Sequence, residues 1–320
     1  MAVRFPLSRS HRPVARRGFT LVEILVASAI MALLTGLVLA LTTNVLNVWN
    51  RSAGKLSANF QGRLAMDLLN QDLEAALFRN DGNQWFSAWV LDNLGPVTAQ
   101  AAQVVFYSPV TDWPPEVPGS LSAVSYRMGY ASPFRAGSGY DQYNLYRAVI
   151  QPQVTFDRML GEENGQDDLR ASFWEGGGVD FTPYSASGAA SPTDTVTFST
   201  ATENIVSAHA VRFGLTLAYE DPGTGDLLDF ADLTNGDPVT DGALAVANVS
   251  YGPDLVVGGN TIPNGRPVYL DVRLTVLTDE GARLLRASID GNAPQTLTEI
   301  IDEFGVTFTR RIAFMNTSGL

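Results

Sequence analysis

An apolar run of 23 residues, Phe19–Leu41, constrains this chain more than any other feature of its sequence. Glu23 is the only charged residue between Arg17 and Arg51. As an α-helix the run is about 35 Å long, enough to cross a hydrocarbon core of about 30 Å. The 18 residues before it hold five arginines and no acidic residue. We therefore expect one membrane span, with the arginines in the cytoplasm and the rest of the chain on the other side.

The position of Gly18 distinguishes this segment from an ordinary secretory signal. A secretory signal has its small-residue cleavage site after the apolar stretch, whereas Gly18 comes before it. Cleavage after Gly18 would remove a basic leader, residues 1–18, and keep the apolar helix. The string Gly-Phe-Thr-Leu-Val-Glu at 18–23 resembles the N-terminal segment of type IV prepilins and type II secretion pseudopilins. The alternative is a plain signal anchor that carries a glutamate.

The resemblance implies roles for three residues. In that family a prepilin peptidase cuts after the glycine, here Gly18, and methylates the new amine, here on Phe19. Glu23, at the fifth mature position, would pair with the Phe19 amine of a neighbouring subunit. A carboxylate within a membrane helix costs about 2.5–3.5 kcal/mol, so a partner of opposite charge is expected. The predicted partners are the peptidase, other pilin or pseudopilin subunits and the membrane.

Beyond the predicted transmembrane and assembly helix, residues 19–41, the helix is expected to continue as an amphipathic segment, residues 42–80. Its apolar residues recur at helical spacing and should face the rest of the protein: Leu56, Phe60, Leu64, Leu68 or Leu69, Leu73 and Leu77. The segment Asn80-Asp81-Gly82-Asn83 is a strong stop signal, so the helix should end at about Arg79.

The remaining residues, 81–320, predict a β-rich extracytoplasmic head. Apolar residues alternate with polar ones in several segments, which is typical of antiparallel strands with one buried face: Val124–Tyr130, Val211–Tyr219, Val268–Val276 and Val306–Phe314, with further candidates at Val104–Tyr107, Asn144–Ile150 and Thr195–Ser199. Short helices are predicted at Asp279–Arg286 and Leu297–Phe304, and long loops at 220–242 and 252–267 among others. The expected fold class is α+β, a long N-terminal helix packed on an antiparallel β-sheet head with long loops.

Composition excludes several kinds of function. The chain has no cysteine, so disulfides, zinc–thiolate sites and cysteine nucleophiles are impossible. Without the leader, 16 basic and 33 acidic residues remain, and this acidic balance argues against nucleic-acid binding. His209 would be the one remaining histidine, expected on the buried face of a strand with Val211 or at a sheet edge. We therefore expect no catalysis and no required cofactor.

The acidic segment Glu220–Asp241 holds weak candidates for calcium ligands, Asp226, Asp229 and Asp232. Carboxylate oxygens suit calcium, but the spacing fails the calcium-loop pattern. A solvated acidic loop is the alternative interpretation. Trp85 and Trp89 are four residues apart and are expected to pack against the head rather than to stack on sugars.

The sequence predicts a structural minor pilin or pseudopilin, most similar to subunits of the J or W type. Ala40 stands where many major pilins have proline, and the absence of cysteine precludes their C-terminal disulfide loop. The subunit should be single-pass in the inner membrane, with a cytoplasmic N-terminus and a head that is periplasmic or, after fibre assembly, extracellular. The alternative is a membrane-anchored binding protein or adhesin, or more weakly a hydrolase, that uses a prepilin-type anchor.

Overall fold

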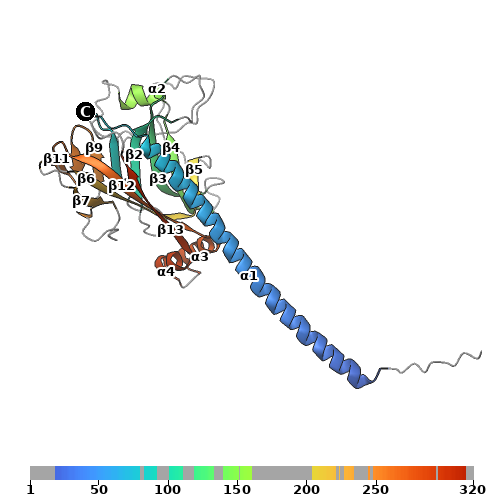
Figure 1. Cartoon of the computed structure of the whole chain (residues 1–320). Coiled ribbons are helices and arrows are strands. Elements are labelled where there is room, and N and C mark those ends of the chain that lie inside the picture. The colour runs from blue at the N-terminus through green and yellow to red at the C-terminus, as the bar shows by residue number, and fades with distance from the viewer. Residues whose placement is uncertain are drawn as a thin grey trace, which may run out of the picture. The chain divides into compact units, whose positions relative to one another are not determined.

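The computed structural model describes residues 19–79, 83–91, 101–110, 119–132, 140–150, 152–160, 204–220, 223, 227–233, 244–245, 248–292 and 295–314 (Figure 1). Gly18, the rest of the leader and the candidate strand Thr195–Ser199 lie outside these ranges. The chain divides into two compact units, residues 1–50 and 51–320.

Helix α1, Leu21–Glu74, is the first element and belongs to both units. It ends five residues before the predicted stop at Arg79. The amide of Ala76 donates to the Leu73 carbonyl at 3.1 Å, and the amide of Leu77 donates to the Tyr107 carbonyl at 2.9 Å. Bonding to a neighbouring strand, rather than the downstream Asn-Asp-Gly signal, therefore ends the helix.

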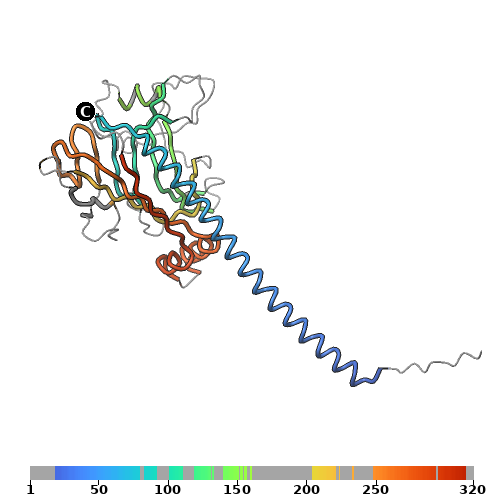
Figure 2. Tube along the Cα trace, in the orientation of Figure 1, coloured from blue at the N-terminus to red at the C-terminus, as the bar shows by residue number. Residues whose placement is uncertain are grey.

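Two β-sheets make up most of the second unit (Figures 1 and 2). The eight-stranded sheet has the order β11-β10-β9-β1-β2-β3-β4-β5. Its strands are β1 Phe86–Val90, β2 Ala102–Ser108, β3 Ser122–Ala131, β4 Gln142–Val149, β5 Ile205–Ala208, β9 Asn248–Tyr251, β10 Leu255–Val257 and β11 Asn260–Ile262. Every residue of β2 is buried, as expected for a central strand with both faces covered.

The five-stranded sheet has the order β13-β12-β6-β7-β8. Its strands are β6 Ala210–Glu220, β7 Leu227–Asp232, β8 Leu244–Ala245, β12 Arg266–Leu277 and β13 Gly305–Ala313. The described strand pairs in both sheets are antiparallel except β7 with β8, which is parallel. The predicted α+β class with a long helix on antiparallel sheet is confirmed, although the strands form two sheets.

Four short helical segments complete the described fold: α2 Pro152–Val154, a π-helical turn Thr155–Met159, α3 Asp279–Ile289 and α4 Leu297–Phe304. Helices α3 and α4 lie side by side (Figure 2), and they approach so closely that a Cβ on Gly281 would lie 2.6 Å from the Phe304 Cβ. Thr278 caps α3 and Thr296 caps α4, the latter with a capping box to Glu299. Both helices match their predicted positions.

The part of α1 in the second unit packs on the sheets through small residues. Ala58, Gly62 and Ala65 are buried together with Leu69 and Leu73, and the ring of Phe308 on β13 fills the space over Gly62. The predicted contact stripe is therefore correct at Leu69 and Leu73 but wrong nearer the N-terminus. There Leu56, Phe60 and Leu64 are 72%, 69% and 52% exposed. Small side chains occupy the buried positions because they let the helix backbone approach the sheet.

An ion pair holds the end of α1 to three strands. The Asp72 carboxylate accepts from Arg147 Nε on β4 at 2.7 Å and from the Tyr126 hydroxyl on β3 at 2.6 Å. The Ser108 hydroxyl on β2 donates to the Asp72 carbonyl at 2.9 Å. The side chains of Arg147 and Asp72 are only 11% and 5% exposed. Burial, followed by the Asp72 charge, raises the pKa of Tyr126 well above its ordinary value, so this hydroxyl stays protonated and donates to the carboxylate.

Candidate functional site

The first described residues carry the predicted processing and assembly site. Phe19 is exposed, and Thr20 occupies the N-cap position of α1. The amide and hydroxyl of Thr20 each donate to Glu23 Oε2 at 2.9 Å, and the Glu23 amide donates to the Thr20 hydroxyl at 3.3 Å. This reciprocal arrangement is a capping box, in which two otherwise unpaired backbone donors at the helix start are satisfied.

The capping box gives Glu23 a local role that sequence reasoning missed. The spacing Thr-x-x-Glu at 20–23 is the sequence signal that predicts it. Among the described residues no basic side chain forms an ion pair with Glu23. Among the described residues, its charge is balanced by neutral donors and by the positive end of the helix dipole. A cation from outside the subunit would complete the site.

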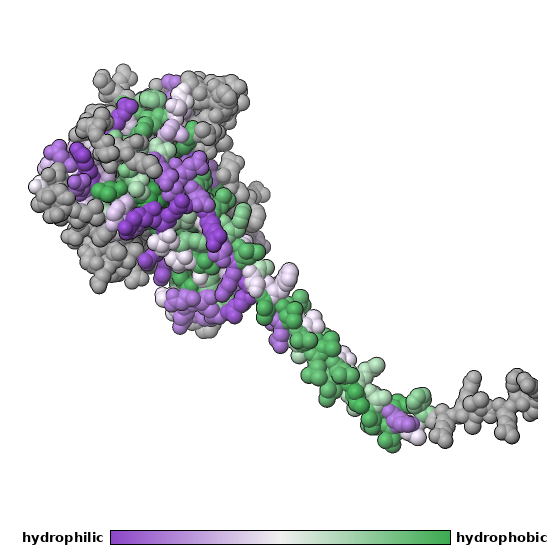
Figure 3. All heavy atoms as spheres, viewed as in Figure 1, coloured by the Kyte–Doolittle hydropathy of each residue, from purple (hydrophilic) through white to green (hydrophobic). Residues whose placement is uncertain are grey.

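The surface of α1 in the first unit is apolar on every side. All residues from 19 to 50 are exposed, including large side chains on different sides of the helix, such as Ile30, Met31 and Leu33. Figure 3 shows the visible face of this segment as almost continuously hydrophobic. By length and composition α1 can cross a membrane, and it is the one described helix of which this is true. A helix that is apolar all round requires lipid or other helices around it.

The calcium candidates are only partly described. Asp226 lies outside the described residues, while Asp229 and Asp232 fall on strand β7. Within the part of the chain that the structure describes, no group of three or more acidic or histidine side chains is placed to hold a metal ion. Calcium binding in this segment therefore stays a prediction.

His209 directly follows β5, the edge strand of the eight-stranded sheet, and is not on a strand. It is the single residue between β5 and β6, so it joins the eight-stranded sheet to the five-stranded sheet, and its φ is +57°. It is therefore not part of a strand, although His209 and Val211 line the same cavity. The predicted packing of Trp85 and Trp89 is confirmed, since both are buried in the core.

Comparison with known proteins identifies the N-terminal segment. Residues 14–39 match the family model described as the prokaryotic N-terminal methylation motif, a range that includes Gly18, Phe19 and Glu23. The chain thus carries this methylation motif, in the same segment where the sequence resembles type IV prepilins. The structure is similar to that of a type IV-like pilin from Thermus thermophilus, with 10% identity, a TM-score of 0.32, and coverage of 82% of this chain and 98% of that chain. No curated protein matches the chain.

Proposed function

We propose that this protein is a structural minor pilin or pseudopilin subunit, cut after Gly18 by a prepilin peptidase, methylated on the Phe19 amine and assembled into a type IV pilus-like or type II secretion fibre. The carrying observation is the N-terminal methylation motif on residues 14–39, most of which belong to a helix that is apolar on every side. Before assembly the helix spans the inner membrane, with the second unit in the periplasm.

The chemistry of the N-terminus supports assembly through Glu23. Cleavage after Gly18 removes five arginines and creates a charged amine on Phe19, four residues before Glu23. In an apolar helix bundle, attraction between that amine and the carboxylate of the next subunit is strong because the dielectric constant is low. The pair also fixes the axial position of one helix on the next. A plain signal anchor would need neither the glutamate nor the preceding Gly-Phe bond.

The outward residues of α1 in the second unit extend the proposed assembly surface. Leu56, Phe60 and Leu64 are exposed at spacings of four, so they share one side of the helix. Exposed apolar side chains in a continuous stripe are typical of surfaces that another protein covers. We propose that a neighbouring fibre subunit covers this stripe.

The N-terminal residue and the intact mass of the protein from its native membrane test the proposal first. We expect a start at Phe19, with one added methyl group on the amine. A start at Met1, or cleavage beyond Leu41, would identify an ordinary anchor or secretory signal and would overturn the proposal.

Two substitutions separate the proposed assembly role of Glu23 from its capping role. Glu23→Ala should leave membrane insertion intact, because the helix becomes more apolar, and should abolish or strongly reduce incorporation into fibres. Thr20→Ala removes the capping hydroxyl but keeps the carboxylate, so incorporation should persist. Fibre yield is measured by shearing and immunoblotting against total membrane protein. Equal loss in both variants would mean that capping, and not pairing between subunits, explains the glutamate.

A further inference from the structure

A cavity of about 270 Å³ lies in the second unit between the end of β3, the start of β4, the β5–β6 connection and helix α3. One wall carries the side chains of Tyr130 and Tyr143, whose ring centroids are 4.7 Å apart, together with Tyr140. The opposite wall is α3, which contributes Arg283 and Arg286. Nothing in the proposed fibre role uses this cavity.

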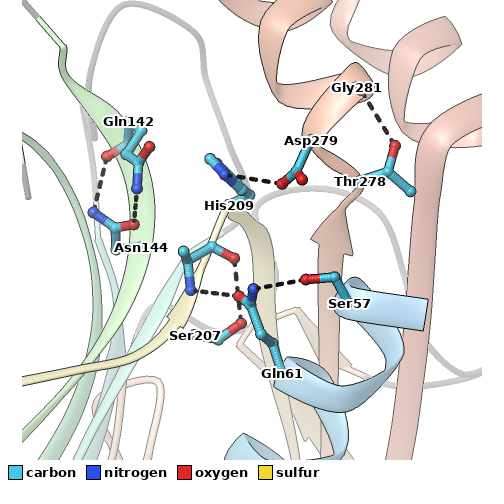
Figure 4. Close-up of polar contacts among 10 residues, drawn as sticks. Ser57, Gln61, Gln142, Asn144, Ser207, His209, Thr278, Asp279 and Gly281 are labelled. Carbon is cyan, nitrogen blue, oxygen red and sulfur yellow. Dashed lines mark hydrogen bonds and ion pairs between the residues drawn. The ribbon is translucent and has the colours of Figure 1, made fainter. Parts of the chain in front are cut away.

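His209 lines the cavity, and its backbone conformation is strained. Its φ of +57° is uncommon for a residue with a side chain. Its Nε2 lies 3.7 Å from Asp279 Oδ1, as Figure 4 shows, while its Nδ1 is buried without a hydrogen-bond partner among the described residues. An unusual backbone conformation and an unsatisfied buried nitrogen each cost free energy, and such features cluster at functional sites.

The surroundings hold His209 in place from both sides. Its carbonyl accepts from the Leu277 amide at 2.9 Å, and the preceding amide, that of Ala208, donates to Gln61 Oε1 on α1 at 3.1 Å (Figure 4). Helix α1 and strand β12 therefore fix the β5–β6 connection between them. The cavity is thus preformed, as small-molecule sites usually are.

The side-chain charges of the described residues that line the cavity balance. Two carboxylates, Asp141 and Asp279, line it together with two guanidinium groups, Arg283 and Arg286. An anionic ligand would meet the carboxylates and a cationic ligand would meet the guanidinium groups. A purely apolar ligand would leave these polar groups without water, which is costly. The balance therefore favours a neutral ligand that carries many hydroxyl groups, each of which can both donate and accept.

The aromatic side chains define the shape of that ligand. Tyr140 is 57% exposed, and the Arg286 guanidinium lies 5.4 Å from its ring centroid, which orients the ring at the cavity mouth. Flat aromatic faces suit flat apolar faces, such as the C–H face of a pyranose ring. The volume is slightly below the roughly 300–1,000 Å³ of sites for drug-sized ligands, so one ring fits and a large ligand does not. We infer that this cavity binds a single neutral hexose residue, presented alone or at the end of a glycan.

The full chain, solubilised in a detergent without a sugar head group, provides the test. Saturation-transfer difference NMR with methyl hexopyranosides and neutral oligosaccharides should show saturable binding, with a Kd on the order of 1 mM for the best single sugar. The matched uronic acid and amino sugar should bind more weakly. Absence of saturable binding by every neutral sugar, or stronger binding of a charged counterpart, would overturn the inference.

Three variants locate the binding. Tyr140→Ala removes an exposed ring and should weaken binding about tenfold, equivalent to about 1.4 kcal/mol. Arg283→Gln, also at an exposed position on α3, should weaken it as well. Phe156→Ala removes an exposed aromatic ring outside the cavity and should leave binding unchanged. Unaltered unfolding temperatures show that the variants are folded, and wild-type affinity in both cavity variants would refute the site. Processing at Phe19 is measured separately, so failure of either proposal leaves the other standing.

Discussion

The two parts of helix α1 solve different packing problems with different residues. In the first unit, up to Asn50, large apolar side chains point outward in all directions and none is buried. In the second unit, from Arg51, the first three buried positions are small, namely Ala58, Gly62 and Ala65. Larger buried residues follow, and the last turn carries a buried charge, Asp72. The first part is exposed on all sides and can contact lipid or neighbouring helices. One side of the second part packs on the sheets of its own subunit.

Hydrophobicity alone therefore does not predict which side of a helix packs inside its own fold. One stripe of large apolar side chains in the second part, Leu56, Phe60 and Leu64, is exposed. The side that packs on the sheets combines small residues with an ion pair, because close approach and satisfied polar groups matter there more than side-chain size.

Asp72→Ala should have the largest effect on stability. The substitution leaves the Arg147 guanidinium buried without its carboxylate, which typically costs about 3–5 kcal/mol of unfolding free energy. Chemical denaturation of the full chain in detergent measures this loss. The control is Asp67→Ala, which removes an ion pair to Arg310 whose aspartate is 72% exposed, so less than about 1 kcal/mol should be lost. Equal losses would mean that the buried pair does not anchor α1.

A matched pair of leucine truncations tests the two sides of the helix directly. Leu69→Ala removes a fully buried side chain and should cost about 2–5 kcal/mol. Leu56→Ala makes the same change on the exposed side and should alter stability by less than about 0.5 kcal/mol. In fibres the order should reverse, with Leu56→Ala reducing incorporation while the subunit stays folded. A large loss of subunit stability from Leu56→Ala would contradict the assignment of the two sides.

Sequence reasoning succeeded where one physical signal dominated. The long apolar run, the alternation in β6, β12 and β13 and the capped helices α3 and α4 each carry a single strong period or cap. It failed where tertiary contacts decided the outcome. Small residues look neutral by themselves, and only the Phe308 ring makes Gly62 a contact residue. Likewise the sequence predicts a surface position for Asp72, and only the folded structure places Arg147, 75 residues away, next to it.

Short strands were missed for a related reason. Strands β10 and β11 have three residues each and lie in a segment, 252–267, that is rich in Gly and Pro and was expected to be a loop. The signal was the Gly258-Gly259 pair, whose φ angles of +57° and +84° make the two-residue hairpin turn that Gly-Gly favours. At the candidate site, sequence predicted Gly18, Phe19 and Glu23, but it could not predict that the single-residue link at His209 opens into a cavity.

Two glycines on α1 give a smaller and more specific test of close approach. A Cβ on Gly62 would overlap the Phe308 ring, so Gly62→Ala should cost about 1–3 kcal/mol despite the better helix propensity of alanine. At Gly54 the new Cβ would lie 3.5 Å from the Thr278 Cβ, an ordinary contact. Gly54→Ala should therefore stabilise the protein by up to about 1 kcal/mol. Adding Phe308→Leu should restore part of the loss at Gly62; stabilisation by Gly62→Ala alone would show that the ring does not press on the helix.

The smallest expected effect is a pH dependence at His209, where the second part of α1 meets the sheet connection through Gln61. Burial lowers the pKa of His209, Arg286 lowers it further, and Asp279 opposes both. Because the unfolded chain, with a histidine pKa of about 6.5, then binds a proton more readily than the folded chain, this contribution to stability is present above that pH and is lost as the pH falls. His209→Asn is the matched variant, since asparagine tolerates a positive φ. Between pH 7.5 and 5.5 the unfolding temperature of the wild type should therefore fall further than that of the variant, and identical falls would mean that His209 is not held neutral by its surroundings.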